Sequence, residues 1–433
     1  MTEFGPGDLA VVIPTRDRLA VLERTLEALR SQTVSGFETV VVADGTDQQL
    51  PDLGDARIVV QEHSGPGAAR NTGVKSTGRP LVLFLGDDMI PDPGLVRTHL
   101  ARHNLRPSPE HAVLGNVEWH PEVPRNRVVR WLEFSATQFD FENIAGEDAG
   151  WGRFYSCNVS LKRDFFQSVG GFDEDFAFDY EDLDLGFRLN EKGMVLWYER
   201  GATARHLHGY DFESLARRYE SRAGAERLMM KKHPWFSPYF ADKVQTARES
   251  PTASAGWVLL AGSRHSRLLS RRVREVARAR TDTWFHQKLG PRFLAAWDAY
   301  DDLSELKAYL GDSFDIELLW NHRRAVDDEE LRAGDEAAFY RSSEMYLYDL
   351  TAFAMTGIKR PYLAALQKLV PPGATVLDFG CGIGSDGLRL LDRGFRMAFA
   401  DFDNPSTRFL RWRLERRASD APVFDLDGDV PGG

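Results

Sequence analysis

The sequence LVLFLGDD, residues 81–88, decides how the rest of the chain is interpreted. Five consecutive apolar residues run directly into two carboxylates. An apolar run of this length predicts a strand buried on both faces, as in the middle of a parallel sheet. Asp87 and Asp88 would then lie at the carboxyl edge of the sheet, where open α/β folds bind ligands. One interpretation is that they close the strand in a turn. The other is that they hold a hard divalent cation such as Mg²⁺ or Mn²⁺, because placing two carboxylates there costs free energy unless a positive charge neutralises them.

The composition limits the class of protein. The chain has 433 residues and a net charge of −11, which favours two or three domains and argues against a general nucleic-acid binder. Cys157 and Cys381 are too far apart in the sequence to suggest a disulfide framework or a metal cluster. We find no signal peptide and no apolar run long enough to span a membrane. These features favour a cytoplasmic protein.

Strand and helix patterns alternate along the first 200 residues. This alternation predicts an α/β fold with a doubly wound, mostly parallel sheet. Loops rich in Asp, Gly, Thr and Arg follow the first strands, and in a parallel sheet they would share one edge. Strands are expected at residues 9–13, 39–42, 57–60, 81–85, 112–119, 154–161 and 194–198, with helices at 19–29, 91–105 and from 181. The aromatic segment 121–150 either covers a pocket or packs as ordinary core.

Seven sequence pieces, in order, carry a resemblance to a known family. They are VVIPTRDR, VVADGTD, SGPGAARNTGV, LFLGDDMIPDPG, NVSLKRDFFQSVGGFDEDF, YEDLDLGFRL and ARHLH. Together they make the first 230 or so residues similar to the family-2 inverting glycosyltransferases, which have a GT-A fold. Each piece alone is a weak signal, but seven at family-like spacing are a strong one.

The resemblance implies a donor site for a nucleotide-diphosphate sugar. By position, Pro14, Thr15 and Arg16 would line the base and ribose. Asp44 would accept a hydrogen bond from the imide N–H of a uracil or thymine ring. Arg70 would face the diphosphate.

The resemblance also implies a metal site. The Asp-x-Asp motif of the family falls on Gly86-Asp87-Asp88, so the first aspartate is a glycine here. Asp88 would be a ligand of Mg²⁺ or Mn²⁺, and Asp87 would lie near the ribose or the metal. His206 would complete the site, with His208 as the alternative.

The pair Glu181-Asp182 would supply the base for inverting transfer. The resemblance assigns the base to Asp182 and places Glu181 beside it. Two adjacent carboxylates raise each other's pKa, which suits a base that works near neutral pH. The simpler interpretation is that both carboxylates cap the helix that begins there.

The middle of the chain, residues 236–345, has a helical pattern. The run RHSRLLSRRVREVARAR, residues 264–280, is strongly basic within an acidic protein. A basic amphipathic helix can lie on anionic membrane, which would give peripheral membrane contact. We favour a helix that packs on the catalytic domain, because its apolar stripe has no aromatic residue.

The C-terminal sequence VLDFGCGIGSDG begins a second nucleotide-binding pattern. Gly382, Gly384 and Gly387 fit the dinucleotide pattern G-x-G-x-x-G, so NAD is an alternative cofactor. From about residue 346 the chain resembles class I methyltransferases, which use S-adenosylmethionine. The resemblance implies that the cofactor is contacted by Asp378, at the end of a strand, and by the loop glycines Gly380, Gly382 and Gly384. It also implies that Asp401 binds the ribose and Asp425 the adenine.

The sequence therefore predicts three segments: a GT-A domain (1–235), a helical extension (236–345) and a partial, Rossmann-like methyltransferase half (346–433). We expect a truncated methyltransferase that does not methylate, because the class I fold needs a larger sheet. The predicted activity is metal-dependent inverting transfer from a UDP- or dTDP-sugar to a hydroxyl of a glycan, lipid-linked or small-molecule acceptor, as in polysaccharide biosynthesis. The alternatives are a methyltransferase whose first domain only binds glycan, and an inactive scaffold. The sequence leaves the oligomeric state open, including a homo-oligomer.

Overall fold

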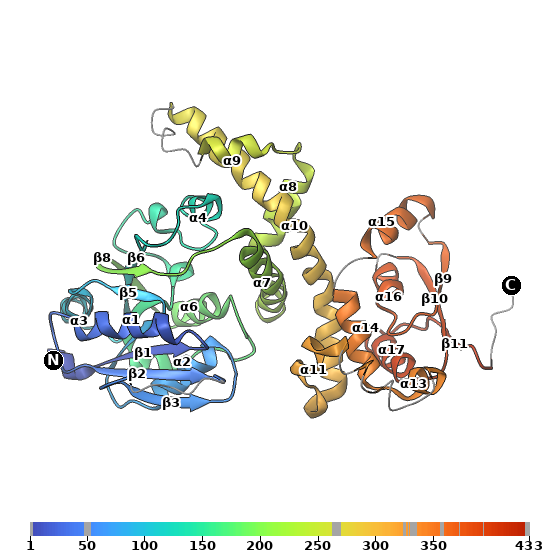
Figure 1. Ribbon diagram of the computed structural model, residues 1–433, viewed down its shortest axis with the longest axis horizontal. Coiled ribbons are helices and arrows are strands. Elements are labelled where there is room, and N and C mark those ends of the chain that lie inside the picture. Colours follow the sequence, from blue (N-terminus) through green and yellow to red (C-terminus); the bar gives the residue numbers. More distant parts are fainter. Residues whose placement is uncertain are drawn as a thin grey trace. The chain divides into compact units, whose positions relative to one another are not determined.

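A computed structural model describes most of the chain. The described residues are 3–46, 53–261, 270–323, 326–327, 329, 336–355, 359–371, 373–392 and 394–428. They form two compact units, Met1–Leu289 and Gly290–Gly433 (Figure 1). The predicted helical extension is thus divided between the two units, and the three-segment division stays a prediction.

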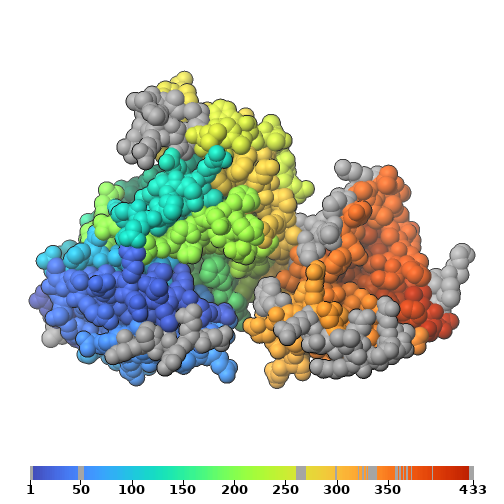
Figure 2. Space-filling view, viewed as in Figure 1, coloured from blue at the N-terminus to red at the C-terminus, as the bar shows by residue number. Residues whose placement is uncertain are grey.

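The first unit is built on an eight-stranded sheet with the order β3-β2-β1-β4-β7-β6-β8-β5. The N-terminal part of this unit, which includes α1, forms the blue surface in Figure 2, whereas the strands β1 and β2 are largely buried. The strands are β1 (Leu9–Thr15), β2 (Glu38–Asp44), β3 (Arg57–Gln61), β4 (Leu81–Leu85), β5 (Met89–Pro91), β6 (His111–Trp119), β7 (Asn158–Lys162) and β8 (Val195–His206).

The sheet is mixed but mostly parallel, as predicted, because β5 and β7 are the two of its eight strands that run against the others. β1, β2, β3 and β4 pair in parallel, as do β6 and β8. β7 runs antiparallel to both of its neighbours, and β5 runs antiparallel to β8. The alternating pattern of the first four strands fixes their direction through crossover helices, whereas nothing local in β7 or β5 reveals their direction.

Helices cover both faces of this sheet. The helices of the first unit are α1 (Leu19–Arg30), α2 (Pro66–Lys75), α3 (Leu95–Leu105), α4 (Arg127–Leu132), α5 (Arg163–Ser168), α6 (Glu181–Glu191), α7 (Phe212–Lys232), α8 (Tyr239–Glu249), α9 (Ala255–Ala261) and the start of α10 (Arg271–Leu310). Alternate residues of β4 enter opposite cores. Val82 and Phe84 pack with α2, α5 and α6, while Leu81 and Leu83 pack with α1 and α3. The strand is buried on both faces, as its apolar run predicts.

Three predicted boundaries are wrong. The strand predicted at residues 154–161 is β7, which begins only at Asn158, and the other two errors concern β8. This strand was expected to end at Tyr198, but it continues to His206 because its second half pairs with β6 and β5. The register shift between Gly115 and Asn116 accommodates the polar turn within it. Pro91, where the sequence predicts the start of a helix, is instead the last residue of β5, which pairs with the edge of β8, and α3 begins at Leu95.

The second unit contains a three-stranded parallel sheet of order β11-β10-β9. Its elements after α10 are α11 (Ile316–Trp320), α13 (Glu336–Ser342), α14 (Met345–Met355), α15 (Arg360–Leu369), β9 (Thr375–Phe379), α16 (Ser385–Leu391), β10 (Arg396–Asp401), α17 (Pro405–Arg416) and β11 (Val423–Asp425). The glycine loop lies between β9 and α16, where the sequence predicts it. A methyltransferase identity for this sheet stays a prediction.

The basic run is described only in part. Residues 264–269 lie outside the described residues, and 271–280 form the first turns of α10, where Val273 and Val276 are exposed. The membrane-surface hypothesis for this run therefore stays open. A search of the described helices found none that combines the length and apolar character of a membrane span.

A buried histidine chain lies under β7. The amide nitrogen of Asn158 donates to two backbone carbonyls, so its oxygen must accept from Nε2–H of His99, 3.1 Å away. His99 Nδ1 then accepts from the Ser160 hydroxyl, whose oxygen accepts from Nε2–H of His103, both at 2.8 Å. Both histidines are therefore neutral. Burial lowers the pKa of His99 to about 4.

This chain predicts acid sensitivity of the fold. Because the pKa of His99 is lower in the fold than the unfolded value of about 6.5, its stabilising contribution is complete above pH 6.5. It is lost as the pH falls toward 4, up to roughly 3 kcal/mol. Urea unfolding at several pH values should show that the free energy of unfolding falls less steeply with decreasing pH in His99→Gln than in the wild type. The partly exposed His120 gives the control His120→Gln, and equal slopes in all three proteins would contradict the histidine chain.

Candidate functional site

The loops after β1, β2 and β4, together with the end of β8, meet at one edge of the sheet. Asp87 and Asp88 follow β4 and are both buried. Thr15, the last residue of β1, donates its hydroxyl to Asp87 Oδ2 at 2.8 Å. Burial and the neighbouring Asp88 raise the pKa of Asp87 to about 6. The two carboxylates thus form a desolvated pair at the edge predicted from the sequence.

The glycine that departs from the Asp-x-Asp motif has a steric explanation. A Cβ on Gly86 would lie 3.0 Å from Asp88 Oδ1 and 3.1 Å from the Met89 side chain. Both contacts are tighter than ordinary packing distances. The glycine leaves room for the Asp88 carboxylate, so its presence does not indicate a degraded site.

Arg18 neutralises both carboxylates, and the sequence reasoning missed it. Its guanidinium donates from Nη1 to Asp88 Oδ2 at 2.9 Å, from Nε to Asp87 Oδ2 at 3.2 Å, and from Nη2 to Asp87 Oδ1. Arg16, the predicted donor-site residue, is exposed and lies 3.8 Å from Asp17. Asp17 has φ = 54°, a left-handed conformation that separates the two arginines. Two arginines in TRDR were the available signal, but only the backbone distinguishes them.

Asp88 and His206 fit the predicted metal site. Asp88 Oδ2 lies 3.3 Å from His206 Nε2, and two cis ligands about 2.1 Å from a metal ion are about 3 Å apart. Burial opposes ionisation of Asp88, but His206, Arg18 and His208 together lower its pKa. Among the described residues no group of three His, Cys, Asp or Glu side chains could hold a metal. A cation here would take its other ligands from water and diphosphate oxygens, as Mg²⁺ and Mn²⁺ commonly do.

Glu181 and Asp182 begin α6 and are largely desolvated. Asp182 Oδ2 accepts from the Ser156 N–H at 3.0 Å, whereas Asp182 Oδ1 and Glu181 Oε2 are buried and have no hydrogen-bond partner in the structure. Burial and then Asp182 raise the pKa of Glu181 to about 8, and burial also raises that of Asp182. Helix capping alone does not account for buried, unpartnered oxygens, which are costly unless a ligand uses them.

The turn before this pair is strained and supported by charge. Asp179 and Tyr180 have φ of 63° and 68°, unusual for residues other than glycine. Asp179 is paired with Arg218 at 3.1 Å and Arg222 at 3.2 Å, and these arginines lower its pKa to about 2 against the effect of burial. Tyr180 donates its hydroxyl to Glu226 at 2.5 Å. All three partners lie on α7, so this helix fixes the direction of the carboxylate pair.

Arg70 lies beside the predicted base pair Glu181–Asp182 rather than in open solvent. It is buried on α2, its Nη1 is 3.6 Å from Glu181 Oε1, and its Nε and Nη1 make no hydrogen bond in the structure. It opposes the rise in the pKa of both Glu181 and Asp182. The unsatisfied nitrogens make Arg70 a candidate anion contact, as the sequence predicts.

Asp44 has a local role that the sequence did not predict. Its carboxylate accepts from Gln61 Nε2 and Ser64 N–H at 2.8 Å and from Gly65 N–H at 3.0 Å, and it contacts His63 Nδ1 at 2.8 Å. These bonds hold the loop that leads into α2. The predicted bond to a uracil or thymine ring would have to be added to this set. Pro14 lies partly buried near the end of β1.

One dipeptide joins the two carboxylate pairs. The N–H of Ser156 binds Asp182, and the carbonyl of the next residue, Cys157, accepts from the Gly86 N–H at 3.2 Å. Both Asp182 and Asp88 raise the pKa of Cys157, after burial. The predicted base and the predicted metal site therefore lie on either side of residues 156–157.

In the second unit, each predicted cofactor acid binds nearby backbone. Asp378 accepts from the Gly387 N–H at 3.1 Å, and Asp401 accepts from the Gly382 N–H at 2.7 Å. Asp425 accepts from a backbone N–H two residues later. Burial raises the pKa of Asp378 to about 6. The structure shows local roles for all three, and their cofactor roles stay predictions.

The glycines of this loop have steric reasons. Gly380, Gly382 and Gly384 all have positive φ. A Cβ on Gly384 would lie 2.4 Å from the Leu410 side chain, and one on Gly387 would lie 2.3 Å from Phe399. Positive φ at Gly380 and tight packing at Gly384 and Gly387 thus account for these glycines without a bound nucleotide.

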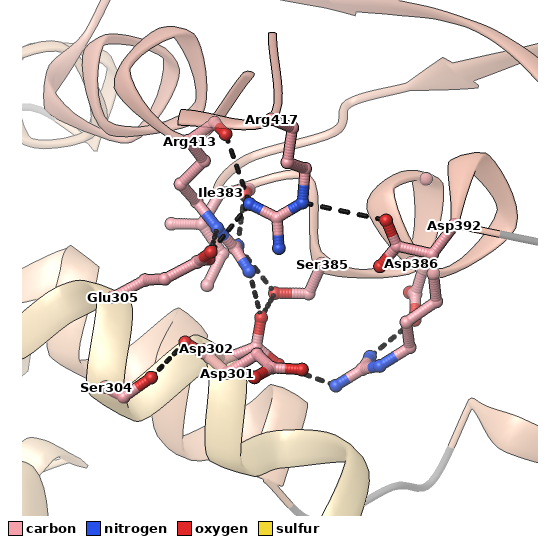
Figure 3. Close-up of polar contacts among 12 residues, drawn as sticks. Asp301, Asp302, Ser304, Glu305, Ile383, Ser385, Asp386, Asp392, Arg413 and Arg417 are labelled. Atoms are coloured by element: carbon pink, nitrogen blue, oxygen red, sulfur yellow. Dashed lines mark hydrogen bonds and ion pairs between the residues drawn. The ribbon is translucent and has the colours of Figure 1, made fainter. Parts of the chain in front are cut away.

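A buried ionic cluster holds the same loop (Figure 3). Arg413 donates to the Ile383 carbonyl at 2.7 Å, to Asp302 at 2.5 Å and to Glu305 at 2.6 Å. Ser385 also donates to Asp302, at 2.7 Å. Arg413 and Asp302 are both almost fully buried. The cluster therefore ties α10 and α17 to the glycine loop with charged groups that satisfy one another.

Residues 10–170 match the sequence model of the family described as Glycosyl transferase family 2. This match agrees with the resemblance to family-2 glycosyltransferases that the sequence motifs carry.

Two of the fourteen relatives that match by sequence illustrate the similarity. Validoxylamine A glucosyltransferase of Streptomyces hygroscopicus subsp. jinggangensis is 34% identical over 229 residues, 44% of this chain and 53% of that protein. Pre-mycofactocin glycosyltransferase of Mycobacterium tuberculosis is 28% identical over 268 residues, 59% of this chain and 53% of that protein. The chain thus spans about half the length of each relative.

Among solved structures, a mannosyltransferase from Pyrobaculum calidifontis in complex with GDP-Man and Mn²⁺ matches 82% of this chain and 87% of that one. It has 14% identity and a TM-score of 0.38, which is too low to establish a shared fold.

The ionic cluster generates a stability prediction. Arg413→Met removes one of the two arginines that bind the buried Asp302, together with the bonds to Glu305 and the Ile383 carbonyl, and should cost about 3–5 kcal/mol of local stability. Hydrogen exchange of the β9 and β10 amides in the full chain measures this loss. Arg408→Met, on the same helix, removes only an exposed pair with Asp403 and should cost about 1 kcal/mol or less. Equal effects of the two substitutions would contradict the cluster's role.

Proposed function

We propose that the chain transfers a sugar, with inversion, from a nucleotide-diphosphate donor to a hydroxyl acceptor. One observation carries this proposal. Asp182 presents a desolvated, unpartnered oxygen on one side of residues 156–157, and Asp88 and His206, 3.3 Å apart, lie on the other side, where they would hold a cation together with diphosphate oxygens. Inverting transfer needs a base at the acceptor and charge compensation at the leaving group, placed apart in this way.

The reaction assigns one role to each side. The oxygen of the acceptor hydroxyl attacks the anomeric carbon of the donor while Asp182 Oδ1 takes the proton of that hydroxyl. The new glycosidic bond forms as the bond from that carbon to the diphosphate oxygen breaks, so the anomeric configuration inverts. The proton ends on Asp182, and the nucleoside diphosphate leaves with the bonding electron pair.

The leaving diphosphate gains negative charge, and several groups of this chain are placed to compensate it. Asp88 and His206 would hold a divalent cation, which when bound acts as a Lewis acid at the diphosphate. Arg70 contributes a buried guanidinium with two unused N–H directions. Arg18 adds a second guanidinium, which lies beside Asp87 and Asp88.

Glu181 acts as a neutral hydrogen-bond donor in this proposal. Its raised pKa keeps it protonated at neutral pH, so it can donate to a sugar oxygen while Asp182 accepts. Adjacent carboxylates with different environments divide the acid and base roles between them.

The finer parts of the proposal concern the partners. We propose a UDP- or dTDP-sugar donor, with Mn²⁺ or Mg²⁺, and a glycan, lipid-linked or small-molecule acceptor. Calorimetry with UDP, dTDP and GDP, each with and without Mn²⁺, identifies the nucleotide. S-Adenosylmethionine in the same panel tests the proposed cofactor site of the second unit, which rests on its sequence motif.

Replacing the base should separate chemistry from binding. Asp182→Asn should lower kcat by at least about a hundredfold, because the amide cannot take the proton, while the Kd for the nucleotide diphosphate stays near the wild-type value. The measurement is sugar transfer together with calorimetry. Glu191→Gln, at the exposed end of the same helix, is the control and should change neither. Unchanged turnover in Asp182→Asn would remove Asp182 as the base.

The roles of the two carboxylates also predict a pH profile. The wild-type rate should rise as Asp182 ionises and fall above about pH 8, where Glu181 loses its proton. Glu181→Gln resembles the protonated form, so it should keep activity near pH 7 and lose the alkaline decline. A rate profile from pH 5 to 10 measures both. An alkaline decline that persists unchanged in Glu181→Gln would assign it to another group.

A further inference from the structure

We propose that Arg18 occupies the cation position of the donor site while no donor is bound, and must leave Asp88 when a metal ion and a diphosphate enter. This inference rests on the proposed function and adds a competition between a side chain of the chain and the metal. It follows from the atoms that Arg18 uses.

The competition concerns one carboxylate oxygen. Arg18 Nη1 and His206 Nε2 both approach Asp88 Oδ2, at 2.9 and 3.3 Å. This is the oxygen that the metal-site geometry requires, since it faces His206. The other oxygen, Oδ1, lies toward Gly86, 3.0 Å from where a Cβ would be. A cation between Asp88 and His206 therefore meets the Arg18 guanidinium at the same oxygen.

Arg18 is the member of this group that is free to move. Its side chain is 41% exposed, whereas those of Asp87 and Asp88 are 1% and 10% exposed. Thr15 holds the Asp87 carboxylate, and the backbone of Asp88 is held by its carbonyl, which accepts from the Leu207 N–H at 2.8 Å. Arg18 can turn outward without opening the core.

The surrounding loop keeps a displaced Arg18 near the site. Asp17 is left-handed, and its carboxylate accepts from the Thr46 hydroxyl at 2.8 Å, which ties this loop to the loop after β2. Arg18 directly precedes α1. Its released guanidinium would remain within reach of a bound diphosphate, which it can bind through two N–H groups.

The consequence is cooperative binding. A metal ion alone must break the Arg18–Asp88 contact without offering Arg18 another partner. A diphosphate offers that partner, so nucleotide and metal should each strengthen binding of the other. Two buried carboxylates also stay neutralised at every stage, which avoids the cost of an unpaired buried charge.

The experiment measures Mn²⁺ affinity of the full chain by electron paramagnetic resonance, without nucleotide and then with UDP. Arg18→Gln should bind Mn²⁺ about tenfold more tightly than the wild type without nucleotide, because one charge-assisted hydrogen bond no longer competes. UDP should increase Mn²⁺ affinity in the wild type, and this increase should shrink about tenfold in Arg18→Gln. Arg18→Lys, which keeps the charge but cannot span both carboxylates, should lie between the two.

The controls separate competition from general electrostatics. Arg24 lies on α1, has the same 41% exposed side chain, and pairs only with the exposed Glu122. Arg24→Gln removes the same charge from the same region and should leave Mn²⁺ affinity unchanged. Thermal unfolding with and without Mn²⁺ gives a second measurement, in which Mn²⁺ should stabilise Arg18→Gln more than the wild type.

The outcomes distinguish this inference from the proposed function. If Arg18→Gln binds Mn²⁺ no more tightly than the wild type without nucleotide, while the wild type binds both Mn²⁺ and UDP, the inference is overturned and the proposed function is not. An equal gain in Arg24→Gln would also overturn it. Mn²⁺ binding that survives Asp88→Ala would instead overturn the proposed metal site, and the inference with it.

Discussion

The burial of paired carboxylates at one edge of the sheet is the constraint on which the first unit depends. Asp87 and Asp88 end one loop, and Glu181 and Asp182 begin a helix at the same edge. Four desolvated carboxyl groups so close together are unfavourable unless each is protonated or compensated. Arg18, Arg70 and His206 supply the compensation, and the raised pKa of Glu181 indicates that one group stays protonated.

The two units treat buried charge differently. In the second unit, Asp302 is bound by Arg413, Arg389 and Ser385, and the result is a closed network that fixes a loop. In the first unit, oxygens of Glu181 and Asp182 and nitrogens of Arg70 have no hydrogen-bond partner in the structure. Satisfied charges hold structure, whereas unsatisfied buried ones are the places where a ligand would recover the lost bonds.

Support for the candidate base comes from a helix that local sequence does not connect to it. Asp179 and Tyr180 adopt left-handed conformations that cost energy at residues other than glycine. Arg218, Arg222 and Glu226 of α7 hold them there. The direction in which Asp182 points therefore depends on residues more than 35 positions later in the chain.

The sequence by itself determined the elements whose signal is local. The apolar run of β4 fixed a doubly buried strand, and the strand–helix alternation placed Asp87, Asp88 and Thr15 at one edge. Tertiary structure decided what depends on distant pairing. It set the antiparallel directions of β5 and β7 and the extension of β8 to His206. It also determined that Arg18, and not Arg16, binds the aspartates, and that the Asp44 carboxylate binds the backbone of its own loop. The physical reason is that hydrophobic periodicity is a property of neighbouring residues. Strand register, the sign of the backbone angle φ and ion pairing are instead set by groups that only folding brings together.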